Sequence, residues 1–137
     1  MAPTGAASVT ATFDKVQIRN NRFGIKGDTS NGPGTTGSIA FTVHDSMISG
    51  NSGAAVSAVN LAVTGPVVAT VSNSALANNS VGVNANGPNT LVRVGGSTLS
   101  GNSSMAFQVQ AGGLARSSGN NTVVGAVGTI SGVDPLM

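Results

Sequence analysis

Phe13-Asp-Lys-Val-Gln-Ile-Arg-Asn-Asn-Arg-Phe-Gly-Ile25 is the stretch that decides the fold, because its pattern returns along the chain. Its centre has the form apolar-x-Gly/Asn-Asn. Four later phrases repeat this form, the last with Ser in the apolar position: Ile48-Ser-Gly-Asn51, Leu76-Ala-Asn-Asn79, Leu99-Ser-Gly-Asn102 and Ser117-Ser-Gly-Asn120. The final Asn residues are 30, 28, 23 and 18 residues apart. A repeat of this kind predicts a solenoid in which each unit forms one coil.

The residues around each phrase have the pattern of β-strands. An apolar residue lies five positions before the Ile or Leu of the first four phrases, namely Phe13, Val43, Val71 and Val94. Apolar and polar residues alternate in stretches such as Ile39-Ala-Phe-Thr-Val43, and the 3.6-residue periodicity of helical repeats is missing. Each unit is therefore predicted to be a strand, a turn at Asn, a short strand and a variable loop.

These patterns predict an all-β, right-handed parallel β-helix of about five coils. The coils span approximately residues 10–37, 38–65, 66–89, 90–113 and 114–132 within a single domain, residues 1–137. The handedness follows from the general preference of parallel crossovers. Ile, Leu and Val are expected to stack inward, and the Asn side chains to bond from coil to coil as an asparagine ladder. Asn31-Gly-Pro33 and Asn86-Gly-Pro88 predict turns in the loops between coils.

The composition fits this fold and excludes several classes of site. The chain has 20 Gly, six Lys and Arg, four acidic residues that are all Asp, and no Cys. A disulfide framework and a thiolate metal site are therefore excluded. The net charge is only +2, and six Lys and Arg residues are too few to form a nucleic-acid surface. No apolar run is long enough to span a bilayer, so no membrane span is predicted.

Three of the phrases and the closing residues also carry a family resemblance: Asp14-Lys-Val-Gln-Ile-Arg-Asn-Asn-Arg-Phe-Gly-Ile25, Asp45-Ser-Met-Ile-Ser-Gly-Asn51, Val94-Gly-Gly-Ser-Thr-Leu-Ser-Gly-Asn102 and Ser117-Ser-Gly-Asn-Asn121. Over most of its length the chain resembles the secreted β-helix repeat proteins of alphaproteobacteria, within the pectin-lyase-like group. The resemblance implies a protein that is secreted or held at the cell surface. Such proteins usually carry a signal peptide and further N-terminal coils, so the chain is expected to be a C-terminal portion of one.

The two ends of the predicted solenoid differ. Residues 127–135 are expected to fold across the last coil and close the C-terminal end. Residues 1–8 are too short to cap the first coil, and an uncovered coil presents unpaired strand edges. Self-association through the N-terminal coil edge is therefore predicted.

The repeat places the rare titratable residues on neighbouring coils. One column of equivalent positions holds Asp14, His44, Ser72 and Gly95. The next column holds Lys15, Asp45, Asn73 and Gly96, and an adjacent turn column holds Ser46, Ser74 and Ser97. Asp14 is therefore expected one coil from the single His of the chain, and Lys15 one coil from Asp45.

The first chemical interpretation of this cluster is a metal site. The oxygen atoms of Asp14, Asp45 and Asn73 are candidate ligands for calcium, which prefers oxygen. His44 would then be a nearby base, and Lys15 a candidate catalytic residue, of a calcium-dependent hydrolase or lyase.

Two other interpretations need no metal. Asp14 orients His44, which deprotonates a water molecule or a hydroxyl such as that of Ser46. Alternatively, the charged residues form exposed ion pairs between coils, and such pairs typically contribute about 0 to 1 kcal/mol.

A second candidate site is basic. Arg19, Arg22 and Lys26 lie around the first Asn turn and are predicted to form a positive patch for an anionic polysaccharide or a small-molecule ligand. Phe23 is the only aromatic residue among them, so base stacking and nucleic-acid binding are not expected. The alternative is a solvated edge without a ligand.

Together these patterns predict a structural or binding β-helix module that assembles through its open coil ends, and the resemblance implies that it belongs to an exported bacterial protein. The alternative is a calcium-dependent hydrolase or lyase that uses the Asp and His residues of the first coils. Calcium is the one cofactor that the residues suggest.

Overall fold

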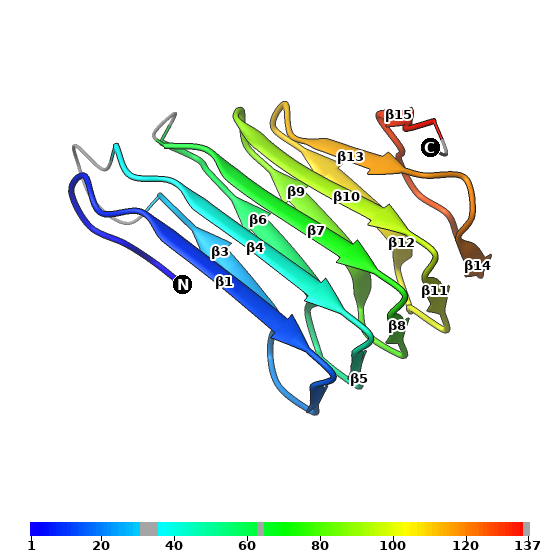
Figure 1. The fold of residues 1–137 in the computed structure, drawn as a ribbon. Helices are drawn as coiled ribbons and strands as arrows, with labels where there is room; N and C mark the ends of the chain where they lie inside the picture. The colour runs from blue at the N-terminus through cyan, green and yellow to red at the C-terminus, as the bar shows by residue number, and fades with distance from the viewer. Residues whose placement is uncertain (31–35, 63–64, 136–137) are drawn as a thin grey trace.

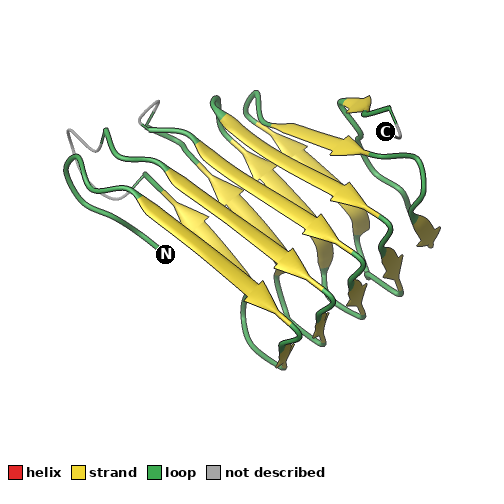
Figure 2. Cartoon of the chain, in the orientation of Figure 1, coloured by secondary structure: helices red, strands yellow, loops and turns green. Residues whose placement is uncertain are grey.

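The structure of the protein is a computed structural model, and it describes residues 1–30, 36–62 and 65–135. The turn predicted at Asn31-Gly-Pro33 lies outside these residues. Every regular element in the described ranges is a β-strand (Figure 2). The strands are β1 (Val9–Asp14), β2 (Gln17–Arg19), β3 (Ile25–Asp28), β4 (Ile39–His44), β5 (Met47–Ser49), β6 (Ala54–Val59), β7 (Val67–Ser72), β8 (Ala75–Ala77), β9 (Val81–Asn86), β10 (Thr90–Gly95), β11 (Thr98–Ser100), β12 (Met105–Gln110), β13 (Leu114–Ser117), β14 (Thr122–Val124) and β15 (Gly132–Val133). The same ranges contain no helix with the length and hydropathy to cross a membrane.

The strands form three parallel sheets around one core (Figure 1). Sheet A has the strand order β1-β4-β7-β10-β13-β15, sheet B has β2-β5-β8-β11-β14, and sheet C has β3-β6-β9-β12. In Figure 1 the strands of sheet A descend in front and those of sheet C ascend behind them, while the coils advance from the N-terminus to the C-terminus. This winding is right-handed, so the predicted right-handed parallel β-helix is confirmed.

Coils 1 to 5 begin with β1, β4, β7, β10 and β13. Coils 1 to 4 contribute a strand to each sheet, whereas coil 5 contributes to sheet C only an isolated bridge between Phe107 and Gly128 among the described residues. Each coil turns at three corners. Turn 1 leads from sheet A to sheet B (residues 15–16, 45–46, 73–74, 96–97 and 118–121), turn 2 leads from sheet B to sheet C (residues 20–24, 50–53, 78–80 and 101–104), and turn 3 leads from sheet C to the next coil.

The sheets place residues that the repeat makes equivalent directly beside one another. In the register of sheet A, Asp14 pairs with His44, His44 with Ser72, and Ser72 with Gly95. The predicted column of these four residues is therefore confirmed. These four residues are the last residues of their strands in sheet A, so the column lies directly next to turn 1.

Coil 5 departs from the predicted alignment. Ser117 pairs with Val94, so the phrase Ser117-Ser-Gly-Asn120 lies at turn 1, whereas the four earlier phrases lead into turn 2. The alignment was wrong because both turns need a left-handed residue followed by a side chain that accepts a hydrogen bond. Gly119 (φ 76°) and Asn121, whose side-chain oxygen accepts a backbone N–H of coil 4, meet that need at turn 1.

Inward side chains stack into columns that fill the core. The largest fully buried side chains come from coils 2 to 4: Ile39, Val43, Ile48, Val56, Val67, Val71, Leu76, Val83, Val92, Val94, Leu99 and Phe107. The ring of Phe41 fits because sheet C has a glycine opposite it, and a Cβ atom at Gly27 would lie 3.0 Å from a ring carbon of Phe41. Coils 2 to 4 are therefore the close-packed body that holds the turns in place.

Candidate functional site at turn 1

Turn 1 carries most of the residues that the sequence singles out, and its backbone explains some of them. In coils 1 to 4 one residue adopts the left-handed conformation: Lys15 (φ 53°), Asp45 (φ 47°), Asn73 (φ 49°) and Gly96 (φ 59°). Gly adopts it freely, and Asn and Asp adopt it more readily than other residues because their short polar side chains bond locally. Asp45 and Asn73 therefore have a structural reason to be there, whereas Lys15 does not.

The next position of turn 1 in coils 2 to 4 is a serine that links neighbouring coils. The hydroxyl oxygen atoms of Ser46, Ser74 and Ser97 each accept a hydrogen bond from a backbone N–H of the preceding coil at 3.1 Å. The same hydroxyl groups donate to a carbonyl oxygen two residues earlier in their own coil. Ser46, the candidate nucleophile, is only 5% exposed, so its hydroxyl serves the backbone of the turn.

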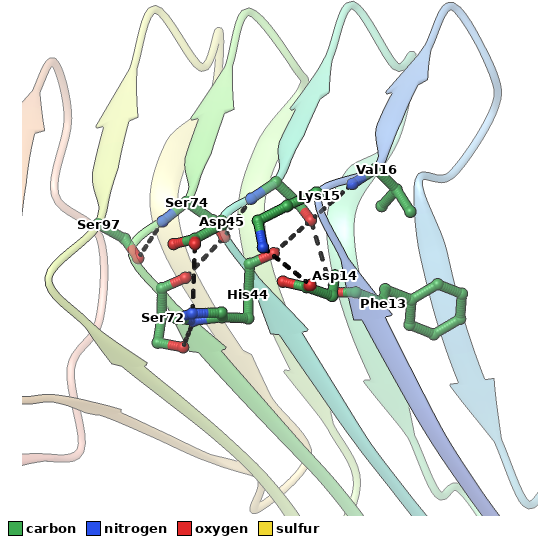
Figure 3. Close-up of polar contacts among 10 residues, drawn as sticks. Phe13, Asp14, Lys15, Val16, His44, Asp45, Ser72, Ser74 and Ser97 are labelled. Atoms are coloured by element: carbon green, nitrogen blue, oxygen red, sulfur yellow. Dashed lines mark hydrogen bonds and ion pairs between the residues drawn. The ribbon is translucent and has the colours of Figure 1, made fainter.

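His44 lies at the centre of the candidate site (Figure 3). Its Nδ1 atom is 2.9 Å from the hydroxyl oxygen of Ser72 in the next coil, and its Nε2 atom is 3.4 Å from a carboxylate oxygen of Asp45. Asp14, in the preceding coil, contacts the ammonium group of Lys15 at 3.4 Å. One ligand atom from each of Asp14, His44 and Asp45 lies within 4.8 Å of the other two. The structure thus gathers four predicted residues and adds Ser72 to them.

The charged side chains of this cluster are open to solvent. The side chains of His44 and Asp45 are each 40% exposed, that of Asp14 is 46% exposed, and that of Lys15 is 73% exposed. Ion pairs with this exposure are screened by water and contribute about 0 to 1 kcal/mol each. The cluster therefore adds little to the stability of the fold.

Ser72, His44 and Asp45 form a chain of contacts of the kind that activates a serine nucleophile. Acyl transfer also needs N–H donors that stabilise the oxyanion of the tetrahedral intermediate. The backbone N–H groups of turn 1 in coils 1 to 4 all donate to the next coil. In coils 1 to 4, where the Ser72 chain of contacts lies, this turn therefore has no free backbone donor for that purpose.

Asn73, the third predicted calcium ligand, directs its side-chain oxygen away from coil 2. A Cβ atom at Gly96, in coil 4, would lie 2.6 Å from that oxygen. Asp45 stands on the other side of Asn73, in coil 2. The two carboxylate groups that do gather are those of Asp14 and Asp45, with His44 between them as a nitrogen donor.

An open groove of about 580 Å³ runs along turn 1. It crosses coils 1 to 4, and its lining side chains become smaller from Lys15 and Gln17 at one end to Gly96 and Thr98 at the other. Its charged groups, Lys15 and Asp45, lie at the end formed by coils 1 and 2. The cluster around His44 therefore adjoins the charged end of this groove.

The predicted basic patch is divided into two parts. Arg22 and Lys26 both lie over the ring of Phe23, at 5.4 and 5.5 Å from its centre, in two cation–π contacts. The guanidinium group of Arg19 instead donates to the side chain of Gln17 at 3.0 Å. Arg19 is thus held toward the groove of turn 1, while the other two cations gather around Phe23.

Lys26 is partly neutralised by an acidic partner. Its ammonium group forms an ion pair with Asp28 at 2.7 Å. Burial raises the pKa of the Asp28 carboxyl group, but hydrogen bonds from Lys26 and Ser30 outweigh burial and hold that pKa below its usual value. Asp28 is therefore ionised at neutral pH, and the positive charge of this patch is smaller than the sequence suggests.

Ser72 is the member of the cluster that the sequence did not assign. It shares the column of His44, one coil further along, so the repeat already places it nearby. The rotamer of His44 decides whether the ring meets Ser72 or Ser46, and spacing in the sequence carries no information about that rotamer.

No protein-family model, curated protein or solved structure matches the chain. The relation to the alphaproteobacterial β-helix proteins stays an expectation from the sequence. A fold alone does not determine function, which depends on the geometry and chemistry of specific surfaces.

Proposed function

We propose that the chain is a structural β-solenoid module that assembles by pairing its N-terminal coil with that of a second copy. The observation that carries this proposal is an incompletely covered core. Val43 and Ile48 of coil 2 are 0% exposed, whereas their counterparts in coil 1, Phe13 and Ile18, are only partly buried. Covering such apolar surface contributes roughly 25 cal/mol per Å².

The backbone at this end is also open along sheet A. β1 is the edge strand of that sheet, and Val9 and Lys15 donate their N–H groups toward coil 2. Because the direction of the N–H groups alternates along a strand, those of Thr10, Thr12 and Asp14 face away from coil 2. An unpaired edge of this kind is a template for pairing with another strand.

The N-terminal residues cover a different sheet. The amino group of Met1 donates to the carbonyl oxygen of Lys26 at 2.7 Å, and the N–H of Asp28 donates to the carbonyl oxygen of Met1 at 2.9 Å. Met1 therefore pairs with β3 at the edge of sheet C. The edge of sheet A stays free of this cover.

The C-terminal end, by contrast, is closed by the chain itself, as predicted. The N–H groups of Ala106 and Phe107 donate to the carbonyl oxygens of residues 126 and 127, and β15 pairs with β13 at the edge of sheet A. Asp134 then binds Arg93 at 3.3 Å and Arg116 at 3.0 Å. Among the described residues this end offers a partner two short edge strands, β14 of three residues and β15 of two, so the best match for the six-residue β1 edge is another β1 edge.

In the proposed dimer, the two β1 strands are related by a two-fold axis near Thr12. Asp14 of one copy would then lie opposite Thr10 of the other, and the two strands would be antiparallel. The two copies of turn 1 would stand at opposite ends of the paired strands, roughly 20 Å apart at 3.3 Å per residue. That separation exceeds the Debye length of about 8 Å, so the basic residues of the two copies do not oppose pairing.

Sedimentation velocity over a range of concentrations tests this assembly. We expect a dimer of twice the 13.3 kDa chain that dissociates on dilution. Thr12→Pro removes an N–H that faces away from coil 2 and leaves the bonds between β1 and β4 in place, so a folded monomer is expected. Thr12→Val keeps the N–H and is the matched control, which should remain dimeric.

Two results would overturn the assembly proposal. One is a wild-type chain that stays monomeric at millimolar concentration. The other is a Thr12→Pro variant that dimerises as strongly as the wild type while its circular dichroism spectrum stays native, because the pairing would then use another surface.

Export to the cell surface is the second part of the proposal, and the sequence resemblance supports it. Fractionation of cells that express the full gene product tests it. We expect the protein in the medium or the surface fraction, and retention in the cytoplasm would exclude this part while leaving the assembly proposal intact.

A further inference from the structure

We propose that Asp14, His44 and Asp45 bind one divalent transition-metal ion of the zinc class at turn 1, a property that does not depend on assembly. The fold brings these residues together from two coils. Asp14 ends β1 and His44 ends β4, and the register of sheet A sets them side by side. Asp45 follows His44 directly, and its left-handed backbone conformation starts turn 1.

The separations of the donor atoms suit a site that closes around an ion. One ligand atom from each residue lies within 4.8 Å of the other two. Ligand atoms around a tetrahedral zinc ion at about 2.0 to 2.2 Å lie roughly 3.4 Å apart. The side chains are 40 to 46% exposed, so small rotations about their side-chain bonds can bring the donors to that spacing. Figure 3 shows the ring of His44 already directed at Asp45.

The chemistry of the donors favours a zinc-class ion over calcium. Calcium takes six to eight oxygen ligands, typically from several carboxylate and carbonyl groups. The cluster supplies two carboxylates and one imidazole, and the Asn73 oxygen faces coil 4 instead. Imidazole with carboxylate is a donor set of zinc and its neighbours in the first transition row.

Ser72 supplies an independent indication, because it occupies the position of an outer-sphere partner. Metal-bound histidines usually donate their second ring N–H to a nearby acceptor, which fixes the tautomer. The Nδ1 atom of His44 is 2.9 Å from the Ser72 hydroxyl oxygen. When Nδ1 donates to this oxygen, Nε2 carries the lone pair and faces Asp45.

Lys15 competes with the ion. Its ammonium group pairs with Asp14 at 3.4 Å, and it must move aside when a divalent cation takes that carboxylate. Removing this charge should therefore strengthen metal binding. Asn in place of Lys15 suits the left-handed backbone, so Lys15→Asn removes the charge without straining the turn.

The proposed site also adjoins the groove. Three protein ligands leave at least one coordination position for water or for an oxygen atom of a ligand. Asp45 and Lys15 line the groove at the end formed by coils 1 and 2. The metal would therefore be accessible to an oxygen-bearing ligand that lies along turn 1.

Isothermal titration of metal-free, tag-free protein with zinc tests the site, and the absorption spectrum of bound Co²⁺ reports its geometry. We expect one ion per chain. His44→Ala and Asp14→Asn should each weaken the affinity by roughly tenfold or more, and Ser72→Ala by about tenfold. Lys15→Asn should strengthen it severalfold. Asn73→Gly, which keeps the left-handed backbone, is the matched control and should leave the affinity unchanged.

The proposal would be overturned by no saturable binding at millimolar zinc, by a folded His44→Ala variant that binds zinc as tightly as the wild type, or by a preference for calcium over zinc. Circular dichroism of each variant verifies the fold. If Asn73→Gly weakens binding as much as Asp14→Asn does, the ligand set is the calcium one, and the zinc proposal fails.

Discussion

Turn 1 and turn 2 give the same backbone shape with different side chains. Both have a left-handed residue in each of the first four coils, and at turn 2 these residues are Asn20, Gly50, Asn78 and Gly101. After this residue, coils 2 to 4 carry a serine at turn 1 and an asparagine at turn 2. The two linking residues differ in length and in the number of hydrogen bonds they make.

Asn79 shows how the longer side chain fills turn 2. It is only 2% exposed, and its side-chain oxygen accepts from the backbone and side-chain nitrogens of Asn51 at 3.1 and 2.8 Å. Its side-chain nitrogen donates to the carbonyl oxygens of Ile48 and Ala77, both at 3.1 Å. The hydroxyl group of Ser74 at turn 1 makes only one hydrogen bond to the preceding coil and one within its own coil.

Turn 1, which has the shorter linking side chains, is therefore the turn with space for a functional site. The groove and the cluster around His44 both lie at turn 1. The polar atoms of the Asn79 side chain at turn 2 are all used for holding coils together. If this division holds, substitutions at turn 2 should destabilise the fold more than substitutions at turn 1.

Asn79→Ala should have the largest effect. It removes the acceptor of the Asn51 N–H and one donor to each of the carbonyl oxygens of Ile48 and Ala77, and it opens a cavity, so we expect a loss of about 3 kcal/mol in the free energy of unfolding. Urea denaturation measures it. A loss below about 1 kcal/mol would mean that water replaces the amide, and that turn 2 is no more closed than turn 1.

Gly50→Ala should cost about 2 kcal/mol. The new Cβ atom would be in a left-handed residue and would lie 2.5 Å from the side-chain oxygen of Asn20. Gly112→Ala is the matched control, because Gly112 has φ 82° but nothing within 4 Å of its Cβ position. It should cost about 1 kcal/mol. Equal losses in thermal or urea unfolding would show that Asn20 simply moves aside.

Ser74→Ala at turn 1 should cost about 1 kcal/mol, because only the N–H of Ser46 loses its acceptor from the preceding coil. Ser80→Ala serves as a control, since that exposed hydroxyl contacts only the hydroxyl of Ser104 at 3.4 Å among the described residues. Its urea midpoint should not change. If Ser74→Ala costs as much as Asn79→Ala, the distinction between the two turns is lost.

Lys15→Asn should give the smallest change, a gain of about 0.5 kcal/mol. Asn relieves the left-handed strain at this position, and the exposed pair with Asp14 that is lost contributes little. Asp45→Asn, which exchanges two residues suited to the conformation, should stay within about 0.5 kcal/mol of the wild type. A clear loss of stability in Lys15→Asn would show that the ion pair outweighs the strain.

The apolar pattern was sufficient to predict which residues of sheet A lie side by side. Once Val43, Val71 and Val94 face the core, the parallel register leaves no freedom for the residues that follow them. Asp14 is therefore beside His44, as the repeat predicts. The alignment of coils 1 to 4 followed from the spacing of the phrases alone.

Finer features of the site depend on information that spacing does not contain. The contact of His44 with Ser72 is set by a rotamer, and the direction of the Asn73 oxygen is set by the glycine beside it in the next coil. The phrase of coil 5 fitted either turn, because both turns require the same backbone shape. The pairing of Met1 with β3 joins residues that no repeat makes equivalent.

Unequal coil lengths have a practical consequence. Seven residues separate the column of Asp14 and His44 from the asparagine that follows turn 1 and sheet B, in each of the first four coils. From that asparagine to the next member of the column the chain takes 23, 21 and 16 residues. The number of residues across turn 1 and sheet B is therefore the same in each of these coils. The rest of the coil, which contains sheet C and turn 3, accommodates insertions. Foreign peptides spliced in after sheet C would lengthen a loop and shift no stacked position, which makes that loop suitable for displaying grafted epitopes.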